Sequence, residues 1–127
     1  MVIVDCAEEY WEFVRTLRNN PLVQDGFIQK SHITKDQQAV YMMKHRSDYF
    51  IALIDNQPVG YVGCIDGDIR VCVDPSYQNK GIGKSLIDFI KSKYSNGYAK
   101  IKIDNEASVK AFQACGFVKK YYILESE

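Results

Sequence analysis

The chain has 127 residues, 46% of them hydrophobic, which is enough for one compact core and too few for two. Its 16 basic and 16 acidic residues give a net charge of zero, so the composition offers no general attraction for nucleic acid or an anionic membrane. No apolar run approaches membrane-spanning length, and the acidic start, with Asp5, Glu8 and Glu9, is unlike a signal peptide. We therefore expect a single domain over residues 1–127, located in the cytoplasm, with neither nucleic acid nor membrane as a partner.

The cysteines also limit the possible classes of site. They are Cys6, Cys64, Cys72 and Cys115. No C-x-x-C pair is present and no histidine stands at ligand spacing, so we expect no metal. A hairpin turn at Asp66-Gly67 places Cys64 opposite Ile69 and Cys72 opposite Tyr61, on opposite faces of the hairpin. Reduced, buried cysteines are therefore expected, as in a reducing compartment.

The N-terminal part of the chain predicts a strand followed by two helices. Val2 to Val4 has the residue types of a short strand, and Asp5 followed by Glu8 has the pattern of a helix N-cap. The apolar face of this first helix consists of Tyr10, Phe13, Val14 and Leu17. A second capping box, Thr34-Lys35-Asp36-Gln37, begins a helix through about Lys44, and breaks at Asn19-Asn20-Pro21 and Asp25-Gly26 separate the two helices.

Strands and turns then alternate in the middle of the chain. The predicted strands are Tyr49 to Ile54, Val59 to Ile65 and Asp68 to Val73. Turns at Asp55-Asn56-Gln57-Pro58 and Asp66-Gly67 connect them, which predicts an antiparallel meander.

The C-terminal part predicts two helices, each followed by a strand. The helix from Gly81 has a buried face with Ile82, Leu86, Phe89, Ile90 and Lys93. Ala99 to Ile103 is the next predicted strand, and a final helix runs from about Asn105 to Gly116, a glycine suited to a left-handed C-cap. Val118 to Leu124 is predicted to complete the sheet.

The segment Gln78-Asn79-Lys80-Gly81-Ile82-Gly83-Lys84 joins the strand ending at Val73 to this helix, and it suits an anion. Glycines allow a tight turn and close approach of a ligand to the backbone, and the first amides of a helix are unpaired donors at the positive end of its dipole. Two other readings remain. Gly81 alone is common as a turn residue, and Gly83-Lys84-Ser85 matches the end of a Walker A loop, although Gln78 stands where that loop has its first glycine.

A second motif follows a short strand pattern downstream, in the segment from Asn105 to Phe117. The order Q-x-x-G-x-G after a strand, then N-x-x-S-x-x-x-(aromatic)-x-x-x-G-F, resembles the acetyl-coenzyme A-binding core of the GNAT N-acetyltransferase superfamily. The exit Val73-Asp74-Pro75-Ser76-Tyr77 is also similar, so the resemblance covers Ile69 to Phe117. It implies an α/β (α+β) fold with a mixed, mostly antiparallel sheet of about six to seven strands and about four flanking helices. The sheet is expected to splay between Asp68–Val73 and Ala99–Ile103.

The resemblance also implies which residues bind acetyl-coenzyme A. Backbone groups of Val71, Cys72 and Val73 are expected at the pantetheine and the thioester carbonyl, with Val71 as the oxyanion donor. The expected pyrophosphate loop consists of Gln78, Asn79, Lys80, Gly81, Ile82, Gly83, Lys84 and Ser85. Asn105 is expected at the pantetheine arm and Ser108 near the pyrophosphate, while Asn105 as a plain N-cap is an equally good reading.

Phe112 is the main departure from the family pattern. Many members have a tyrosine there whose hydroxyl protonates the leaving thiolate, which phenylalanine cannot do. General acid catalysis contributes on the order of 10²–10⁴-fold, so its loss does not exclude turnover. Phe112 is expected to pack in the core beside the cofactor. Substitute acids or bases are Tyr61, Cys72, Tyr41 and His45, whereas His32 and His45 also fit ordinary surface positions.

For the acceptor, hairpin register places Tyr61, Gly63, Arg70 and Cys72 on one face, beside the expected thioester. We therefore nominate Tyr61 and Arg70 as acceptor-site residues, against the alternative of a solvated or salt-bridged edge. Leu17–Val23 and Ile33-Thr34 weakly resemble members that act on amino sugars or protein N-termini. The expected reaction is acetylation of a primary amine of a small molecule, with an amino sugar as one candidate, by a monomer or homodimer. The alternatives are an acetyl-coenzyme A-binding module with little turnover, a protein amine acetyltransferase and a small nucleotide-binding protein.

Overall fold

A four-stranded antiparallel sheet forms the centre of the structure, a computed structural model that describes residues 1–127. Its strands are β1 (Val2–Asp5), β2 (Tyr49–Ile54), β3 (Gln57–Ile65) and β4 (Asp68–Val73), in the order β1-β2-β3-β4. The predicted meander is therefore confirmed. β4 lies at an edge of the sheet, because its only further neighbour is a single parallel bridge between Asp68 and Tyr98.

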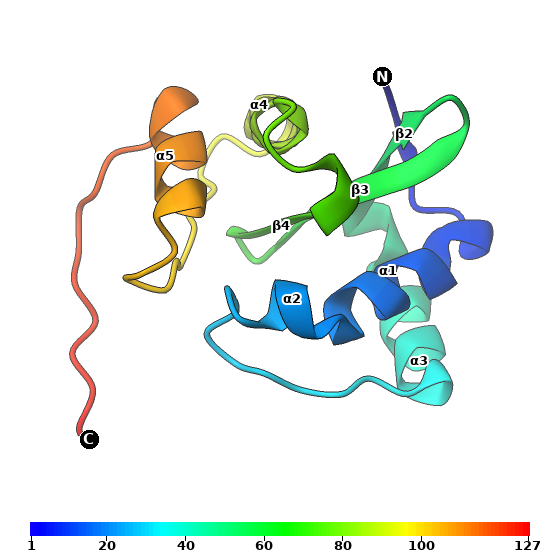
Figure 1. Cartoon of the computed structure of the whole chain (residues 1–127), viewed down its shortest axis with the longest axis horizontal. Helices are drawn as coiled ribbons and strands as arrows, with labels where there is room; N and C mark the ends of the chain where they lie inside the picture. The colour runs from blue at the N-terminus through cyan, green and yellow to red at the C-terminus, as the bar shows by residue number, and fades with distance from the viewer.

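Helices cover both faces of this sheet (Figure 1). The α-helices are α1 (Trp11–Asn19), α2 (Pro21–Gln24), α3 (Lys35–His45), α4 (Ile82–Lys93) and α5 (Glu106–Ala114). The short 3-10 helices are η1 (Glu8–Tyr10), η2 (Arg46–Asp48) and η3 (Pro75–Tyr77). In Figure 1, α1, α2 and α3 lie on one side of the sheet and α4 on the other, with α5 next to α4. No helix combines the length and the apolar character that crossing a bilayer requires.

Because both faces are covered, the alternation along the strands produces two cores. Val62, Cys64 and Ile69 belong to the core against α4 and α5, together with Leu86 and Phe112. The opposite face packs against α1 and α3, through Tyr49, Ile51, Tyr61, Cys72, Val14 and Met42. The face that the sequence assigned to the acceptor is thus a second core at Tyr61 and Cys72, which are 3% and 8% exposed.

Several local predictions are confirmed. Cys64 pairs with Ile69 and Cys72 with Tyr61 in the β3–β4 register, across a turn in which Asp66 and Gly67 have φ angles of 52° and 84°. All four cysteines are buried and free. The Thr34–Gln37 capping box begins α3, with both of its hydrogen bonds formed. Gly116 has a φ of 89° at the end of α5, as a left-handed cap requires.

One prediction in the N-terminal part is wrong, and one helix there was not predicted. Asp5 is the last residue of β1 rather than a helix cap, because the chain continues extended to Ala7 before η1 and α1. The expected break at Asn19-Asn20-Pro21 is confirmed, since α1 ends at Asn19 and Asn20 is extended, but a short helix, α2, follows it, and its N-cap Asn20 accepts a hydrogen bond from the Leu22 amide. Proline at the first helical position favours such a turn, so the same residues end α1 and begin α2. The fold therefore has five α-helices instead of about four.

The predicted number of strands is also wrong, since the sheet has four strands instead of six to seven. Ala99 to Ile103 keeps the burial of a strand only in its first part, with Ala99 and Ile101 packed on the core, whereas Ile103, which a strand would place on the same face, is 94% exposed. It forms no ladder, because its contact with β4 is limited to the bridge at Tyr98. Alternation sets the buried side of an extended segment but does not supply a partner strand.

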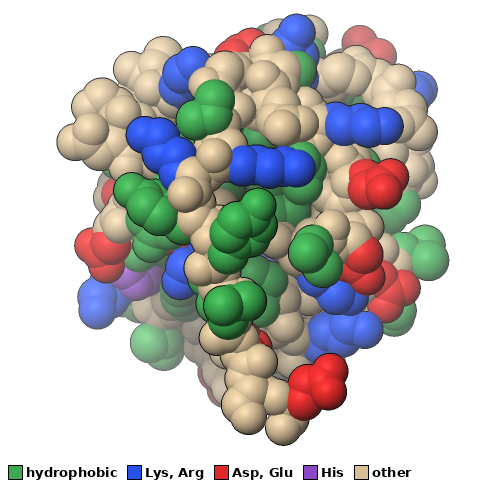
Figure 2. Space-filling view, turned by 90° about the vertical axis from the view of Figure 1, so that its left-hand side faces the viewer, with side chains coloured by type: hydrophobic (Ala, Val, Ile, Leu, Met, Phe, Trp, Pro, Cys, Tyr) green, Lys and Arg blue, Asp and Glu red, His purple; other side chains and the backbone are tan.

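Residues 118–127, which we call the tail, likewise form no strand and are exposed throughout. The tail runs as an extended chain away from α5 (Figure 1). Its apolar side chains are Val118, Tyr121, Tyr122, Ile123 and Leu124, between 66% and 93% exposed. Figure 2 views this side of the molecule, where separate apolar side chains stand at the surface among lysines and arginines. The tail therefore adds no packing to either core.

Candidate functional site

The open edge of β4 carries unpaired backbone groups. The Ile69 amide donates to the Tyr98 carbonyl at 2.8 Å, on the side of β4 away from β3. Amides along a strand alternate between its two sides, so the Val71 and Val73 amides point to this same open side. The Asp74 amide has the opposite parity and donates to the Val59 carbonyl of β3 at 2.8 Å, as expected. Val71 and Val73 thus present N–H donors where no strand follows.

Cys72 differs from its two neighbours in this respect. Its carbonyl points toward β3, because a Cβ on Gly60 would lie 2.8 Å from that oxygen. The sequence predicted three backbone units at the pantetheine and the thioester. Those of Val71 and Val73 therefore face the open edge, whereas that of Cys72 faces β3 inside the sheet.

A second set of free amides lies at the start of α4. The first intrahelical hydrogen bond runs from the Ser85 amide to the Gly81 carbonyl at 3.1 Å. No side chain caps this helix, so the amides of Ile82, Gly83 and Lys84 remain unpaired. Such a terminus binds an anion through its N–H groups and the helix dipole.

The backbone before α4 is suited to a ligand. Gly81 has a φ of 78°, and a Cβ built on it would meet nothing within 4 Å, so the space in front of the helix is open. Asn79 also adopts a positive φ, 63°. A Cβ on Gly83 would lie 3.7 Å from Cγ2 of Val73, so the first turn of α4 packs on the end of β4. The two sets of free amides are therefore neighbours.

The side chains of this loop extend into solvent. Gln78, Asn79, Lys80, Lys84 and Ser85 are exposed. The Lys80 Nζ lies 5.6 Å from the centroid of the Tyr77 ring. An anion at the α4 amides would therefore lie near two lysines, with no carboxylate paired to either.

Asn105 is the N-cap of α5, as one of the two sequence readings proposed. Its Oδ1 accepts the Ser108 amide at 3.3 Å, and its Nδ2 donates to the Gly26 carbonyl at 3.3 Å. Through this second contact Asn105 joins α5 to the segment after α2. The sequence reading missed that connection, which has no local signal.

Phe112 packs in the core, 5% exposed, with its ring edge-on to Phe117 at 5.1 Å between centroids. Its predicted role as a core aromatic is confirmed.

Tyrosines gather on the other face of the hairpin. The hydroxyls of Tyr41 and Tyr49 are 2.7 Å apart, and Arg70 Nη1 donates to the Tyr41 hydroxyl at 3.0 Å. Arg70 also lies 3.6 Å from Asp68, so part of the salt-bridged alternative is correct. Burial, followed by the neighbouring Tyr41, raises the pKa of Tyr49 well above its usual value, so this phenol is neutral at physiological pH.

Tyr61 and Cys72 are cross-strand neighbours beside Val71. Burial, followed by the nearby Cys72, raises the pKa of Tyr61 well above its usual value. Burial and then Asp74 raise the pKa of Cys72 to about 12. Both groups are neutral at pH 7, so neither is a general base or a thiolate nucleophile.

The remaining histidines lie outside this group. His45 Nδ1 lies 3.8 Å from Asp48, and its ring lies 4.7 Å from that of Tyr41. His32 is exposed, as the sequence reading allowed. Arg18 was not nominated from the sequence, yet its guanidinium lies 5.5 Å from the centroid of Tyr41.

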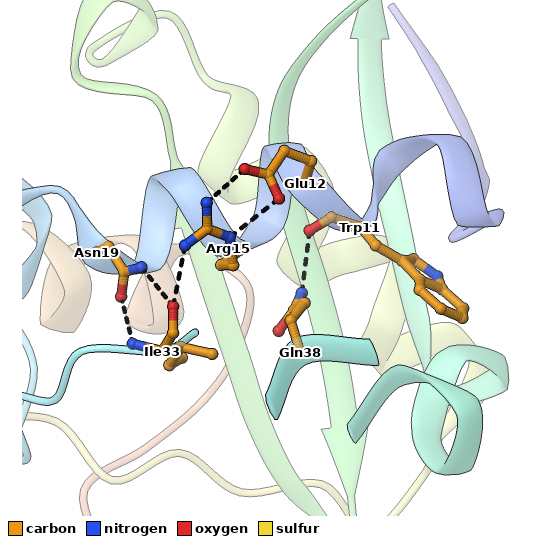
Figure 3. Close-up of polar contacts among 6 residues, drawn as sticks. All are labelled: Trp11, Glu12, Arg15, Asn19, Ile33 and Gln38. Atoms are coloured by element: carbon orange, nitrogen blue, oxygen red, sulfur yellow. Dashed lines mark hydrogen bonds and ion pairs between the residues drawn. The ribbon is translucent and has the colours of Figure 1, made fainter. Parts of the chain in front are cut away.

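The segment between α2 and α3 is held against α1 (Figure 3). Asn19 Nδ2 donates to the Ile33 carbonyl and Asn19 Oδ1 accepts the Ile33 amide, both at 2.8 Å. Arg15 Nη1 donates to the same carbonyl at 3.1 Å. Gln38 Nε2 donates to the Trp11 carbonyl at 3.1 Å and joins α3 to α1. These contacts hold Ile33 and α3 against α1.

Solved structures with a similar fold include two N-acetyltransferases. Spermidine N-acetyltransferase from Vibrio cholerae, solved with coenzyme A and spermine, superposes with a TM-score of 0.84 at 18% identity over 98% of this chain and 85% of its own. A domain from Methanocaldococcus jannaschii superposes with a TM-score of 0.78 at 22% identity, over 94% of this chain and 88% of its own. An aminoglycoside N-acetyltransferase solved with coenzyme A superposes with a TM-score of 0.75 at 19% identity, over 99% of this chain and 93% of its own. No curated protein sequence matches the chain.

At these identities the superpositions establish the fold, and the sequence establishes the family. Residues 45–119, more than half of the chain, match the family described as the acetyltransferase (GNAT) domain. The matched region contains both the open edge of β4 and the loop into α4. The chain therefore belongs to the GNAT acetyltransferase family, whose acyl donor is acetyl-coenzyme A.

Proposed function

We propose that this protein, acting as one domain over residues 1–127, transfers an acetyl group from acetyl-coenzyme A to a primary amine of a small molecule. The observation that carries the proposal is that the start of α4 packs on the end of β4, at Gly83 and Val73, which brings the free amides of α4 and of β4 to the same edge. A ligand with a diphosphate at one end and a polarised carbonyl at the other would use both sets. The open space in front of Gly81 and the absence of a side-chain cap on α4 support this fit.

In this reaction the Ile82, Gly83 and Lys84 amides bind the diphosphate, and the Val73 backbone holds the pantetheine arm. The Val71 amide donates to the thioester oxygen, where negative charge develops as the amine attacks. This donor belongs to the backbone and is fixed by the sheet, so it needs no reorganisation. Acetyl-coenzyme A supplies the activated acyl group.

The buried side chains favour direct attack by the amine. A thiol with a pKa of about 12 is almost entirely protonated at pH 7, so an acyl-cysteine at Cys72 is disfavoured. Tyr61 is neutral and no group of the protein hydrogen-bonds its hydroxyl, so it is available as a proton donor to the leaving thiolate. This role would replace the hydroxyl that Phe112 lacks.

Within this proposal the acceptor is a small amine, with an amino sugar as one candidate, rather than a peptide. The wall formed by α1 and the segment to Ile33 is short and tied down by Arg15 and Asn19, which leaves little room for a docked peptide.

Calorimetric titration with acetyl-coenzyme A, coenzyme A and ATP tests the proposal. We expect tight binding of the first two and weak binding of ATP, whose phosphates alone would not use β4. Mass spectrometry of an amine panel then identifies acceptors. Preference for ATP would overturn the transferase assignment, and acetyl-coenzyme A binding without acetylation of any amine would favour a binding module.

A further inference from the structure

Arg18 is a half-buried cation without a partner. The chain has four arginines. Arg15 pairs with Glu12, Arg70 pairs with Asp68, and Arg46 is exposed to solvent. Arg18, in the last turn of α1, has neither a carboxylate partner nor a side-chain hydrogen bond, although it is only partly accessible. A guanidinium has five N–H donors, and leaving them unpaired away from water is unfavourable.

Tyr61 is a second polar group without a partner close by. The residue is only 3% exposed, and its hydroxyl forms no hydrogen bond with another group of the protein. The charge of Arg18 acts on Tyr61, Tyr49 and Cys72, where it opposes the effect of burial on each pKa. The geometry agrees, because Arg18 lies over the ring of Tyr41, and Tyr41, Tyr49 and Tyr61 follow one another with ring centroids 5.9 Å and 6.0 Å apart. Arg18 and Tyr61 therefore belong to one cluster on this face of the hairpin.

The carboxylates near Arg18 and Tyr61 do not neutralise the charge of Arg18. Asp68 is used by Arg70, and the Asp74 Oδ1 accepts the Ser76 amide at 2.9 Å. Arg70 donates to the Tyr41 hydroxyl, and Arg18 lies over the ring of the same tyrosine. Two guanidinium groups thus flank Tyr41, and the one on α1 lacks a counter-ion.

We infer that the Arg18 guanidinium binds an anionic group of the amine acceptor, a carboxylate or a phosphate, on the face of the hairpin that carries Tyr61. The inference rests on the proposed function, because it places the anion beside the amide that would hold the thioester. An Arg–carboxylate or Arg–phosphate pair is charge-assisted and often bidentate, which satisfies donors that the protein leaves open. A polycation such as a polyamine would instead bring positive charge to an unneutralised arginine.

The test uses acceptors that differ only in the anion. The pairs are 3-aminopropanol with β-alanine, ethanolamine with O-phosphoethanolamine, and glucosamine with glucosamine 6-phosphate, with spermidine as the polycation. Release of the coenzyme A thiol is measured at saturating acetyl-coenzyme A. We expect the anionic member of at least one pair to exceed its partner by about tenfold or more in kcat/KM. The carboxylate and phosphate pairs distinguish the two sources of the anion.

Arg18→Gln should reduce kcat/KM for the preferred anionic acceptor by roughly 10- to 100-fold, mainly through KM, and leave the neutral partner unchanged. Arg18→Lys should retain part of the preference. Arg46→Gln, the same change at an exposed and unpaired arginine, is the matched control and should have no effect. The melting temperature of Arg18→Gln should fall by no more than about 4 °C, because the guanidinium makes no hydrogen bond or ion pair with the protein and only lies over the Tyr41 ring. A lower melting temperature with equal losses for both members of a pair would mean a structural role and overturn the inference.

A binding measurement separates this inference from the proposed function. With the protein saturated in coenzyme A, so that the α4 amides are occupied, acetate or inorganic phosphate should raise the melting temperature of wild type and Arg46→Gln but not of Arg18→Gln. Equal responses in all three proteins, or a preference for neutral or polycationic amines unaffected by Arg18→Gln, would overturn the inference while leaving acetyl transfer intact. Failure to bind coenzyme A would overturn the proposed function, and the anion titration would then be judged on the free protein.

Discussion

Replacing Gly81 by valine tests whether the loop before α4 binds the cofactor through its backbone. The position has a φ of 78°, in the left-handed region that costs an L-residue about 1–2 kcal/mol, and more for a β-branched one. At about 4 °C per kcal/mol, the melting temperature should fall by about 4–8 °C. Nothing in the protein lies within 4 Å of the new Cβ, so the fold should survive. The side chain would occupy the space in front of the free α4 amides, and we expect acetyl-coenzyme A affinity to fall at least tenfold by calorimetry.

Two control variants separate strain from obstruction. Gly81→Asn tolerates the left-handed region, as Asn79 already does at 63°, so its melting temperature should stay near that of wild type. Gly83→Ala places a Cβ at an ordinary 3.7 Å from Val73 in a helical position and should stabilise the protein by about 0.5–1 kcal/mol, while still crowding the diphosphate. A folded Gly81→Val, Gly83→Val double variant with unchanged acetyl-coenzyme A affinity would refute the reasoning.

Three further changes test the site and the fold. Phe112→Tyr should bind acetyl-coenzyme A normally but lose about 1–3 kcal/mol of stability if its hydroxyl is buried without a partner. A gain in kcat, with a new basic limb in its pH profile, would contradict the role of Tyr61 as the proton donor. Removal of the tail should leave the urea midpoint unchanged, because none of its residues is buried, and a lower midpoint would show packing that the structure lacks. Burial raises the pKa of the Cys72 and Cys6 thiols from 9.0 to about 12, so at high pH the folded state keeps protons that the unfolded state loses. The stability that these thiols contribute is complete below pH 9 and should decline between pH 9 and about 12, as measured by urea titrations. A urea midpoint that does not change over that interval would count against this burial.

Local chemistry explains what the sequence could predict. The Asp66-Gly67 turn defined the β3–β4 register, and with it the pairing of Tyr61 with Cys72. The Thr34 capping box and the Gly116 cap were readable because each depends on a few adjacent residues. The free amides of α4 followed from Gly81 and Gly83 for the same reason.

Features that depend on distant contacts were not predictable. Ala99 to Ile103 alternates as a strand would, but its pairing with β4 ends at Tyr98. The burial of Tyr61 depends on α1 and α3 covering a face that the hairpin pattern alone allowed to be solvated. The sequence did not indicate Arg18, because a single arginine at the end of an amphipathic helix resembles an ordinary surface residue. It stands out only in the structure, where Arg15 and Arg70 have carboxylate partners and the half-buried Arg18 has none.

The open edge of β4 also matters for the colloidal behaviour of the protein. An unpaired strand edge is a template on which another extended chain can add, and proteins normally protect such edges with charges, bulges or a covering segment. Here the N–H and C=O groups that we propose as cofactor ligands are the ones left unprotected, and the tail of this chain is an exposed, extended segment with two tyrosines. A bound ligand would therefore act as a cap on the sheet, so the free protein should self-associate more readily in concentrated solution than the loaded one.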